Sequence, residues 1–370
     1  MCPDSPASPF PPDYALARGR FLKEAEAAGA DLSAYLHPLR GARGEELAID
    51  IAVLRPSGAR AALVIASATH GVEGFAGSGI QHDLLTGRRR WLGELPVALV
   101  LVHAHNPHGF SFVRRTDENN VDLNRNGLHF DAGLPETPEY DELHPLLLPE
   151  DWEGPSHAAA RARLAQLAAE RGQRRVTAAI AGGQWRHPDG LFFGGQGPSF
   201  ACRTIHKLCR YELAEFDSLV LLDLHTGLGP RGHGELIHAG PSGTPAQRRL
   251  AAWFGAELTS SDDGSSVSTP VRGTIDQVYR RALLERPERP TPDFAGLVLE
   301  FGTVPLAEVL EALIGDNWLH ARGEPDSELG RRIKARLKAA LFGADPDWQA
   351  AVLERARQVA ARLARGLAGD

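Results

Sequence analysis

The sequence has few cysteines, no excess of basic residues and no long apolar run. Its three cysteines, Cys2, Cys202 and Cys209, are sparse and odd in number, which argues against a disulfide framework. The net charge of −7 with neutral histidines provides no basic field for nucleic acid or anionic lipid. No apolar stretch approaches the roughly 20 residues of a membrane span. We therefore expect neither a nucleic-acid partner nor a membrane partner.

The amino terminus and the composition favour one cytoplasmic domain. Residues 1–13 are rich in proline and predict a loose arm that lacks the basic and apolar segments of a signal peptide. A hydrophobic content of 43% is enough for a sizeable core, and neither a repeat nor a convincing linker divides the chain. The sequence predicts a single domain over residues 1–370. The arm forms one end of this domain, and a helical extension over about residues 320–370 forms the other.

Apolar runs alternate with stretches of helical spacing along the chain. This alternation predicts an α/β fold with a mostly parallel mixed sheet and helices on both faces. Strands are expected at 47–54, 61–69, 96–102, 219–224, 234–238 and 296–300. Helices are expected at 14–28, 74–85, 158–169, 201–213, 244–257, 305–314 and 329–367, with a break near 343–346.

A long connection interrupts this alternation at residues 132–155. It is rich in proline and acidic residues and shows no clear periodicity. Long structureless loops inside compact domains are usually functional lids or disordered inserts. Because this connection closely follows the candidate site described next, we expect it to form a rim or a lid.

Imidazole and carboxylate side chains stand at the ends of three predicted strands. His70 and Glu73 follow the strand at 61–69, and His225 and Glu300 end two later strands. The carboxyl ends of parallel strands meet at one crevice, where ligands bind. Two imidazoles and one carboxylate can hold zinc with an open fourth position, and a further carboxylate can act as a general base. The pattern predicts a metal-dependent amide hydrolase.

Other interpretations of these histidines remain open. If Glu73 lies in the first helical turn, it shares a face with His70, although a histidine near a glutamate is common. His225 could be a core histidine that the backbone satisfies, but the glycine that follows it closely favours the crevice. His103 and His105, two apart on a strand, form a rival metal pair of the barrel amidohydrolase type. No eightfold strand–helix repeat surrounds them, so we favour a lining or supporting role.

Two arginines between residues 114 and 126 indicate a site for an anionic group. Arg125 lies beside Asn124, and a guanidinium can hold a carboxylate through a bidentate pair of hydrogen bonds. Arg115 could polarise a carbonyl group or stabilise an oxyanion. The alternatives are a solvated turn for Arg115 and a structural salt bridge to the acidic connection for Arg125.

Taken together, these motifs resemble the zinc carboxypeptidases of the carboxypeptidase A type. The resemblance extends from about residue 60 to residue 303 and is closest to a bacterial branch described only as a domain of unknown function. That branch is also related to succinylglutamate desuccinylase/aspartoacylase enzymes. The motifs follow the family's order and occur at strand ends, which makes the signal specific. They are residues 69–74, 106–110, 115–126, 223–227 and 299–303.

The resemblance implies one zinc ion, Zn²⁺, per chain. His70, Glu73 and His225 would bind it. Asp122 would accept a hydrogen bond from the far nitrogen of His70 and so fix the orientation of that ring.

The resemblance also implies how a substrate is bound and cleaved. Arg115 would polarise the scissile carbonyl group, and Asn124 and Arg125 would bind a substrate carboxylate. Glu300 would be the general base and then the acid toward the leaving amine. The partner would be a small peptide or N-acyl amino acid with a free carboxylate.

One departure from the family pattern concerns the tyrosine that closes over the bound carboxylate. Residues 273–276 resemble the family's specificity-pocket segment, but the expected tyrosine position is Ser268, and Tyr279 has no assigned place. Metallocarboxypeptidase activity is the leading prediction and N-acyl amino acid deacylation is the alternative. A non-catalytic zinc-pocket binder is a third possibility, and the presence of Glu300 and Arg115 disfavours it.

Overall fold

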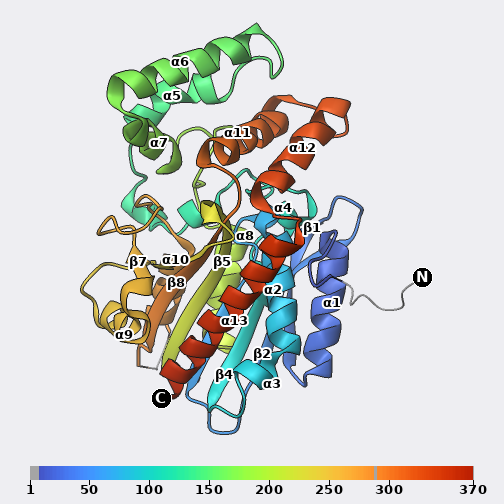
Figure 1. Cartoon of the computed structure of the whole chain (residues 1–370), viewed down its shortest axis with the longest axis vertical. Coiled ribbons are helices and arrows are strands. Elements are labelled where there is room, and N and C mark those ends of the chain that lie inside the picture. Colours follow the sequence, from blue (N-terminus) through green and yellow to red (C-terminus); the bar gives the residue numbers. More distant parts are fainter. Residues whose placement is uncertain (1–7, 287–289, 370) are drawn as a thin grey trace.

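The computed structural model describes residues 8–286 and 290–369. In this part of the chain, one mixed sheet comprises Asp31–Arg40 (β1), Glu46–Leu54 (β2), Ala61–Ala66 (β3), Val97–His103 (β4), Ser218–Arg231 (β5), Gly234–His238 (β6), Leu258–Ser260 (β7) and Asp293–Gly302 (β8). The spatial order is β1-β2-β4-β3-β5-β8-β6-β7 (Figure 1). The central strands β4, β3, β5 and β8 are parallel, and so is the pair β6–β7. The predicted mostly parallel mixed sheet is confirmed.

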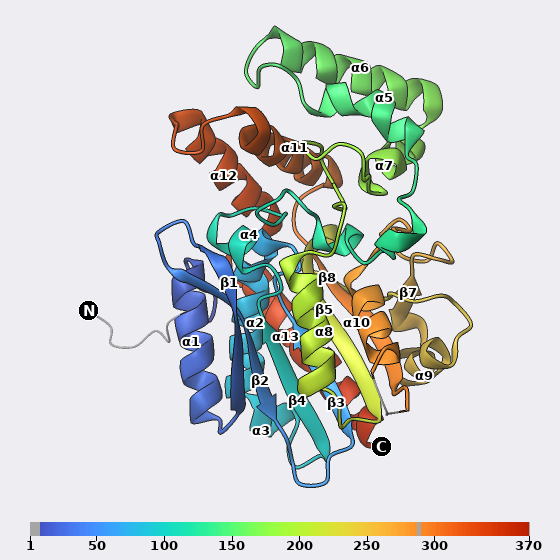
Figure 2. The same cartoon turned by 180° about the vertical axis from the view of Figure 1, so that it is seen from behind.

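Helices cover both faces of this sheet, as predicted (Figures 1 and 2). The helices are Tyr14–Ala27 (α1), Gly74–Thr86 (α2), Arg88–Trp91 (α3), Pro107–Ser111 (α4), Pro138–Leu147 (α5), Pro155–Arg171 (α6), Gln173–Ala181 (α7), Phe200–Tyr211 (α8), Pro245–Phe254 (α9), Ile275–Leu284 (α10), Leu306–Arg322 (α11), Glu328–Leu341 (α12) and Pro346–Ala368 (α13). Short 3-10 turns occur at Gly71–Glu73 (η1), Leu123–Arg125 (η2), Phe130–Ala132 (η3) and Gly255–Glu257 (η4). Helices α1, α2, α9 and α13 share an apolar core with one face, and α8 and α10 share one with the other. None of the described helices is long and apolar enough to cross a membrane.

Burial on both faces explains why the central strands are continuous apolar runs. On β3, Leu63 and Ile65 pack toward α2 and α13, whereas Val64 and Ala66 pack toward α8 and α10. Successive side chains of a strand point to opposite faces, so a strand covered on both sides needs apolar residues throughout. Each fully buried residue of this type contributes about 1.5–3 kcal/mol. This burial fixes the strands whose ends carry the candidate site.

Both ends of the chain pack against the domain, and the predicted C-terminal helices and the break between them are present as α12 and α13. Residues 1–7 lie outside the described residues, but the rest of the predicted loose arm is packed. Phe10 is only 6% exposed, and its ring centroid lies 5.5 Å from that of Phe342 and 6.4 Å from that of Trp348. At the other end, α13 lies along the sheet, where Val352 and Leu363 join the main core. An apolar stripe on each segment therefore docks it against the domain.

The connection at 132–155 is not structureless, because it contains α5. Tyr140, Leu143 and Leu147 are buried at helical spacing. Pro138 occupies the first turn, where proline is tolerated, so the proline content concealed the helix. Helices α5, α6 and α7 form a lobe at the top of Figure 1, beyond the carboxyl ends of the central strands.

Candidate functional site

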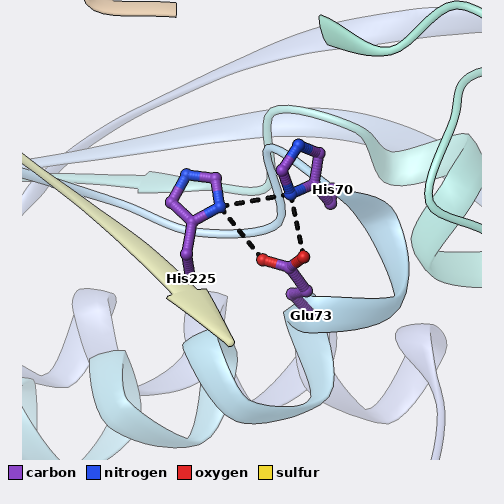
Figure 3. A group of neighbouring side chains, drawn as sticks. All are labelled: His70, Glu73 and His225. Atoms are coloured by element: carbon purple, nitrogen blue, oxygen red, sulfur yellow. Dashed lines mark hydrogen bonds and ion pairs between the residues drawn. The ribbon is translucent and has the colours of Figure 1, made fainter. Parts of the chain in front are cut away.

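Three of the predicted residues meet at the carboxyl ends of β3 and β5. His70 follows β3, Glu73 ends η1, and His225 lies in β5 (Figure 3). Glu73 Oε1 is 2.8 Å from Nδ1 of His70, and Oε2 is 3.0 Å from Nδ1 of His225. The two Nδ1 atoms are 3.2 Å apart. All three side chains are buried, and together they could bind a metal ion.

Glycines let the turn after His70 pack against a second predicted motif. A Cβ atom on Gly71 would lie 2.1 Å from the carbonyl carbon of Gly109, and one on Gly74 would lie 2.6 Å from the ring of Phe110. The backbone N–H of Gly71 donates to the carbonyl of Arg115. Close packing of these segments therefore places His70 and Arg115 at the same site.

The Asp223 carboxylate contacts the His225 ring at Nε2, on the side away from the potential metal position. His225 Nε2 is 2.6 Å from Oδ2 of Asp223. With the Nε2–H donating to Asp223, the Nδ1 lone pair faces Glu73 and His70. The carboxylate and the ring nitrogens that converge here need a positive charge among them, which either protons on the imidazoles or a metal ion can supply. The arrangement fits a metal ion held by two imidazoles and one carboxylate.

His70 has two alternative hydrogen-bonding arrangements. Its Nε2 lies 3.3 Å from Oδ1 of Asp122 and 2.6 Å from Nη2 of Arg115. When Nε2 accepts from Arg115, the proton is on Nδ1 and is donated to Glu73. When Nε2–H donates to Asp122, as predicted, Nδ1 is free to bind a cation. Arg115 also donates from Nε to Asp122 at 2.9 Å, so the Asp122 carboxylate orients both groups.

The charges at the site favour a cation among these three side chains. Burial opposes the charged form of Glu73, yet His70 and His225 hold its pKa below the usual range. Burial also opposes a charge on His225, but Asp223 and Glu73 raise its pKa well above the usual range. The surrounding carboxylates therefore stabilise a positive charge at the centre of the group.

Glu300 lies in β8 directly beside His225, its register partner in β5. Its side chain is 8% exposed, and Oε1 accepts a hydrogen bond from the N–H of Leu228 at 2.9 Å. Burial, together with the negative charge of Glu73, raises the pKa of Glu300 to about 7. A carboxyl group with a pKa near neutrality is suited to both accepting and donating a proton.

The predicted carboxylate-binding residues are close together, but much of their hydrogen-bonding capacity is used internally. Asn124 Oδ1 accepts from the N–H of Ile275, the first residue of α10. Arg125 is 4% exposed and donates to the carbonyls of Asn124 and Ala181, while its Nε has no partner. Burial lowers the pKa of Arg125 to about 10. It forms no salt bridge with the acidic residues of 132–155, all of which are described, so that alternative is not supported.

No sequence pattern indicated Phe192, which follows α7 in the chain and packs beside the site. The guanidinium carbons of Arg115 and Arg125 lie 5.1 and 5.3 Å from the centroid of its ring. Its φ of 56° is unusual for an aromatic residue. The ring thus contacts both candidate substrate-binding arginines through cation–π interactions.

His105 supports His225 through a chain of buried hydrogen bonds. Thr69 Oγ1 lies 2.8 Å from Oδ1 of Asp223 and 2.8 Å from Nδ1 of His105. His105 Nε2 lies 2.9 Å from the Tyr279 hydroxyl. Burial lowers the pKa of His105 to about 4, so it is neutral. The alternation of Asp223 and His225 on one strand face was the available sequence signal for this support.

His103 lies in a different environment, which removes the support for the rival metal pair. Its Nε2 lies 2.9 Å from Ser78 Oγ, and its ring stacks on Phe21 with centroids 4.8 Å apart. Neither His103 nor His105 belongs to a possible metal-binding group within the described residues. Burial lowers the pKa of His103 to about 3.

Replacement of His103 should remove part of the protein's acid sensitivity. An unfolded histidine takes up a proton below about pH 6.5, whereas folded His103 does so only near pH 3. Its contribution to stability is therefore complete above pH 6.5 and is lost as the pH falls. From pH 8 to pH 5, the wild type should lose about 2 kcal/mol more free energy of unfolding than His103→Gln. Urea unfolding at both pH values measures this difference, and an equal loss in both proteins would contradict it.

A second group of possible metal ligands comprises His144 of α5 in the lobe, together with His187 and Asp189, which follow α7. The two imidazole rings stack with centroids 4.1 Å apart and an interplanar angle of 21°. Near-parallel rings do not direct their in-plane lone pairs toward one point, and the Asp189 side chain is exposed. This geometry fits a metal ion less well than the group at His70.

One cavity of about 200 Å³ joins the predicted residues. It is lined by His70, Glu73, Arg115, Asn124, Arg125, His225 and Glu300, and Asp122 lies behind them. No residue of 132–155 lines the cavity, and the lobe instead contributes Thr177 and Ala181 of α7. All five tyrosines are described and none lines it, whereas Ser268 does. The rim prediction therefore fails for this segment, and Tyr279 has a supporting position.

The model of one protein family, described as "Protein of unknown function (DUF2817)", matches residues 10–355. No curated protein matches the chain. Among solved structures, the chain is similar to carboxypeptidase A from Helicoverpa armigera (11% identity, 89% and 73% of the two chains covered, TM-score 0.42). It is also similar to the murein-tripeptide amidase MpaA from Escherichia coli O157 (16%, 88% and 100%, 0.38). A third is a Shewanella amazonensis SB2B protein provisionally assigned to the succinylglutamate desuccinylase/aspartoacylase family (20%, 79% and 73%, 0.38). At these TM-scores the likenesses do not assign an activity.

Proposed function

The chain belongs to the family described as protein of unknown function (DUF2817), and we propose that it is a zinc-dependent hydrolase of amide bonds. The observation that carries the proposal is a buried group of two imidazoles and one carboxylate beside Glu300. The leading activity is that of a metallocarboxypeptidase acting on a short peptide. N-acyl amino acid deacylation is favoured as a second activity because the cavity of about 200 Å³ is smaller than most ligand pockets.

The ligand set supports zinc in particular. His70, Glu73 and His225 would hold the ion and leave a position open, and Asp122 and Asp223 would orient the imidazoles. A bound zinc ion would supply Lewis acidity and lower the pKa of a water molecule to about 7.

The remaining residues have roles that match their positions. Glu300 would take a proton from water and later deliver it to the leaving nitrogen, which its raised pKa allows. Arg115 lines the cavity with its Nε fixed by Asp122, so its outer nitrogens could donate to a carbonyl oxygen. A protein that only binds a ligand does not need a protonatable carboxyl at this point.

Arg125 should make hydrolysis depend on a free substrate carboxylate. A buried guanidinium whose Nε has no partner favours a charged hydrogen-bond acceptor. Amidation of that carboxylate in one N-acyl amino acid and one N-acyl dipeptide should lower kcat/KM by about one to two orders of magnitude. Arg125→Ala should erase the difference between the free and amidated forms.

Two controls separate binding from stability. Arg174→Ala removes an exposed arginine of α7 that does not line the cavity, and this variant should keep the preference. The thermal midpoint of Arg125→Ala shows whether that variant is folded. If it is not folded, Arg125→Gln is measured in its place. Equal rates of the wild type on free and amidated substrates would rule out carboxylate anchoring.

A further inference from the structure

We propose that the cavity accepts a short, uncharged apolar acyl group beside Glu300. The inference rests on the proposed hydrolase function and names the substrate class: N-acyl amino acids or short peptides with an apolar acyl part. An acidic acyl group, such as succinyl, should be a poor substrate. The inference is drawn from a continuous apolar wall of the cavity and its position relative to the reacting groups.

The wall is one face of α11 together with the end of α12. Leu306, Val309, Leu310 and Leu313 follow the spacing of a single helical face, and all four line the cavity, as does Leu341. Leu306 is 49% exposed although it is a leucine at the mouth of a cavity. Val309 and Leu313 are buried at 4% and 5% exposure, so the wall leads from an exposed leucine into an apolar interior, which suits an apolar ligand.

This wall reaches Glu300 at Gly227. A Cβ atom on Gly227 would lie 3.0 Å from Leu341, 3.7 Å from Val309 and 3.9 Å from Oε1 of Glu300. Glycine therefore leaves free the space in which the wall and the carboxyl group meet. A group that contacts the wall here is adjacent to the bond under attack. Because the proposed function places the carboxylate-bearing amine part at Asn124 and Arg125, we assign the group on this wall to the acyl part.

The end of the cavity at Asn124 adjoins the face of the sheet that α8 and α10 cover, whereas the apolar wall adjoins the face that α13 covers. Asn124 is hydrogen-bonded to the first residue of α10, which packs on the face covered by α8. Leu341 ends α12 just before α13, which covers the opposite face. The His70 group stands at the strand ends between them. A substrate bound across the edge would thus place its carboxylate near Asn124 and its acyl chain against α11.

The charges that line the cavity exclude an anionic acyl group. Its only lysine or arginine side chains are Arg115 and Arg125, and the proposed function assigns these two to the scissile carbonyl and to the substrate's own carboxylate, so neither is left for a second carboxylate. A carboxylate against the wall would lose its hydration without gaining a partner. Each methylene that contacts the wall should instead raise kcat/KM by about fourfold.

The test compares acyl groups on one amino acid, alanine with a free carboxylate. Rates on N-acetyl-, N-propanoyl-, N-butanoyl- and N-pentanoyl-alanine should increase in that order. N-succinyl-alanine has nearly the shape of the pentanoyl compound but carries a carboxylate, and it should be at least about 100-fold poorer. Leu306→Lys should lower the rate on N-pentanoyl-alanine and raise the rate on N-succinyl-alanine, so the ratio of the two rates should fall. Leu284→Lys alters a leucine of α10 that is 59% exposed and outside the cavity, so it should not narrow the gap.

The outcomes distinguish this inference from the proposed function. Hydrolysis of the pentanoyl and succinyl compounds at equal rates would overturn the apolar site and leave the hydrolase proposal standing. If neither compound is hydrolysed, and an N-acyl dipeptide with a free carboxylate is not hydrolysed either, the hydrolase proposal fails, and calorimetric binding of the first two compounds then decides the inference. Tighter binding of N-pentanoyl-alanine supports the apolar site. Equal binding, or no binding of either compound, overturns it.

Discussion

Replacement of Glu300 by glutamine is expected to leave the zinc content unchanged and to lower kcat by about 10²–10⁴-fold. Glutamine has nearly the same shape, and its carbonyl oxygen can still accept from the N–H of Leu228. It cannot take a proton from water at neutral pH. The measurements are zinc content by elemental analysis, the thermal midpoint, and kcat on an N-acyl amino acid.

Glu235 provides a matched control for this substitution. It is the register partner of Glu300 on β6, but its carboxylate accepts from Thr259 Oγ1 at 2.7 Å and does not line the cavity. Glu235→Gln should therefore retain most of the turnover. If Glu300→Gln is nearly as active as the wild type while Glu235→Gln is inactive, the general base has been assigned to the wrong glutamate.

Removal of either imidazole ligand should abolish zinc binding and turnover without unfolding the sheet. His70→Ala and His225→Ala each delete one of three ligands, and neither residue belongs to the apolar cores. Their zinc affinity should fall by more than the roughly 10–100-fold that follows loss of a supporting carboxylate. The zinc affinity of Asp223→Asn should fall by only about 10–100-fold, because this variant loses a supporting carboxylate and keeps all three ligands. Competition with a chromogenic chelator measures all three affinities.

His144→Ala is the control for the second group of possible ligands. Its ring is not part of the cavity, so the substitution should change neither zinc affinity nor turnover. Loss of zinc from His144→Ala, together with retention by His225→Ala, would place the metal in the lobe. That result would contradict the proposed site.

The sequence predicted those parts of the fold that are buried on both sides. Strands such as β3 and β4 are continuous apolar runs, so their ends, and hence His70, could be located. The edge strand β1 is largely exposed and has no such run. Helix α5 begins with a proline, which made its sequence resemble a loop. The exposure of β1 and the proline at the start of α5 are therefore the reasons why the sequence did not predict these two elements.

Site residues that lie at the ends of buried strands could be predicted from the sequence. Contacts made by segments that are far apart in the chain could not. His70, His225 and Glu300 converge because β3, β5 and β8 are neighbours in a parallel array. The partners of Arg125 include the carbonyl of Ala181, which ends α7 of the lobe, and the ring of Phe192, which follows the lobe in the chain. Nothing local in the sequence relates these segments to one another. The contacts depend on tertiary packing of the lobe above the sheet.

Restoration of activity by zinc is the decisive experiment for a catalytic zinc ion held by His70, Glu73 and His225. The purified wild type is stripped with a chelator and then titrated with zinc, while hydrolysis of an N-acyl amino acid with a free carboxylate is followed. We expect stripping to abolish turnover. Activity should then return in proportion to added zinc and reach its plateau at about one ion per chain. Full activity in the stripped, metal-free protein, or failure of the wild type to bind zinc at all, would contradict a catalytic zinc ion at this site.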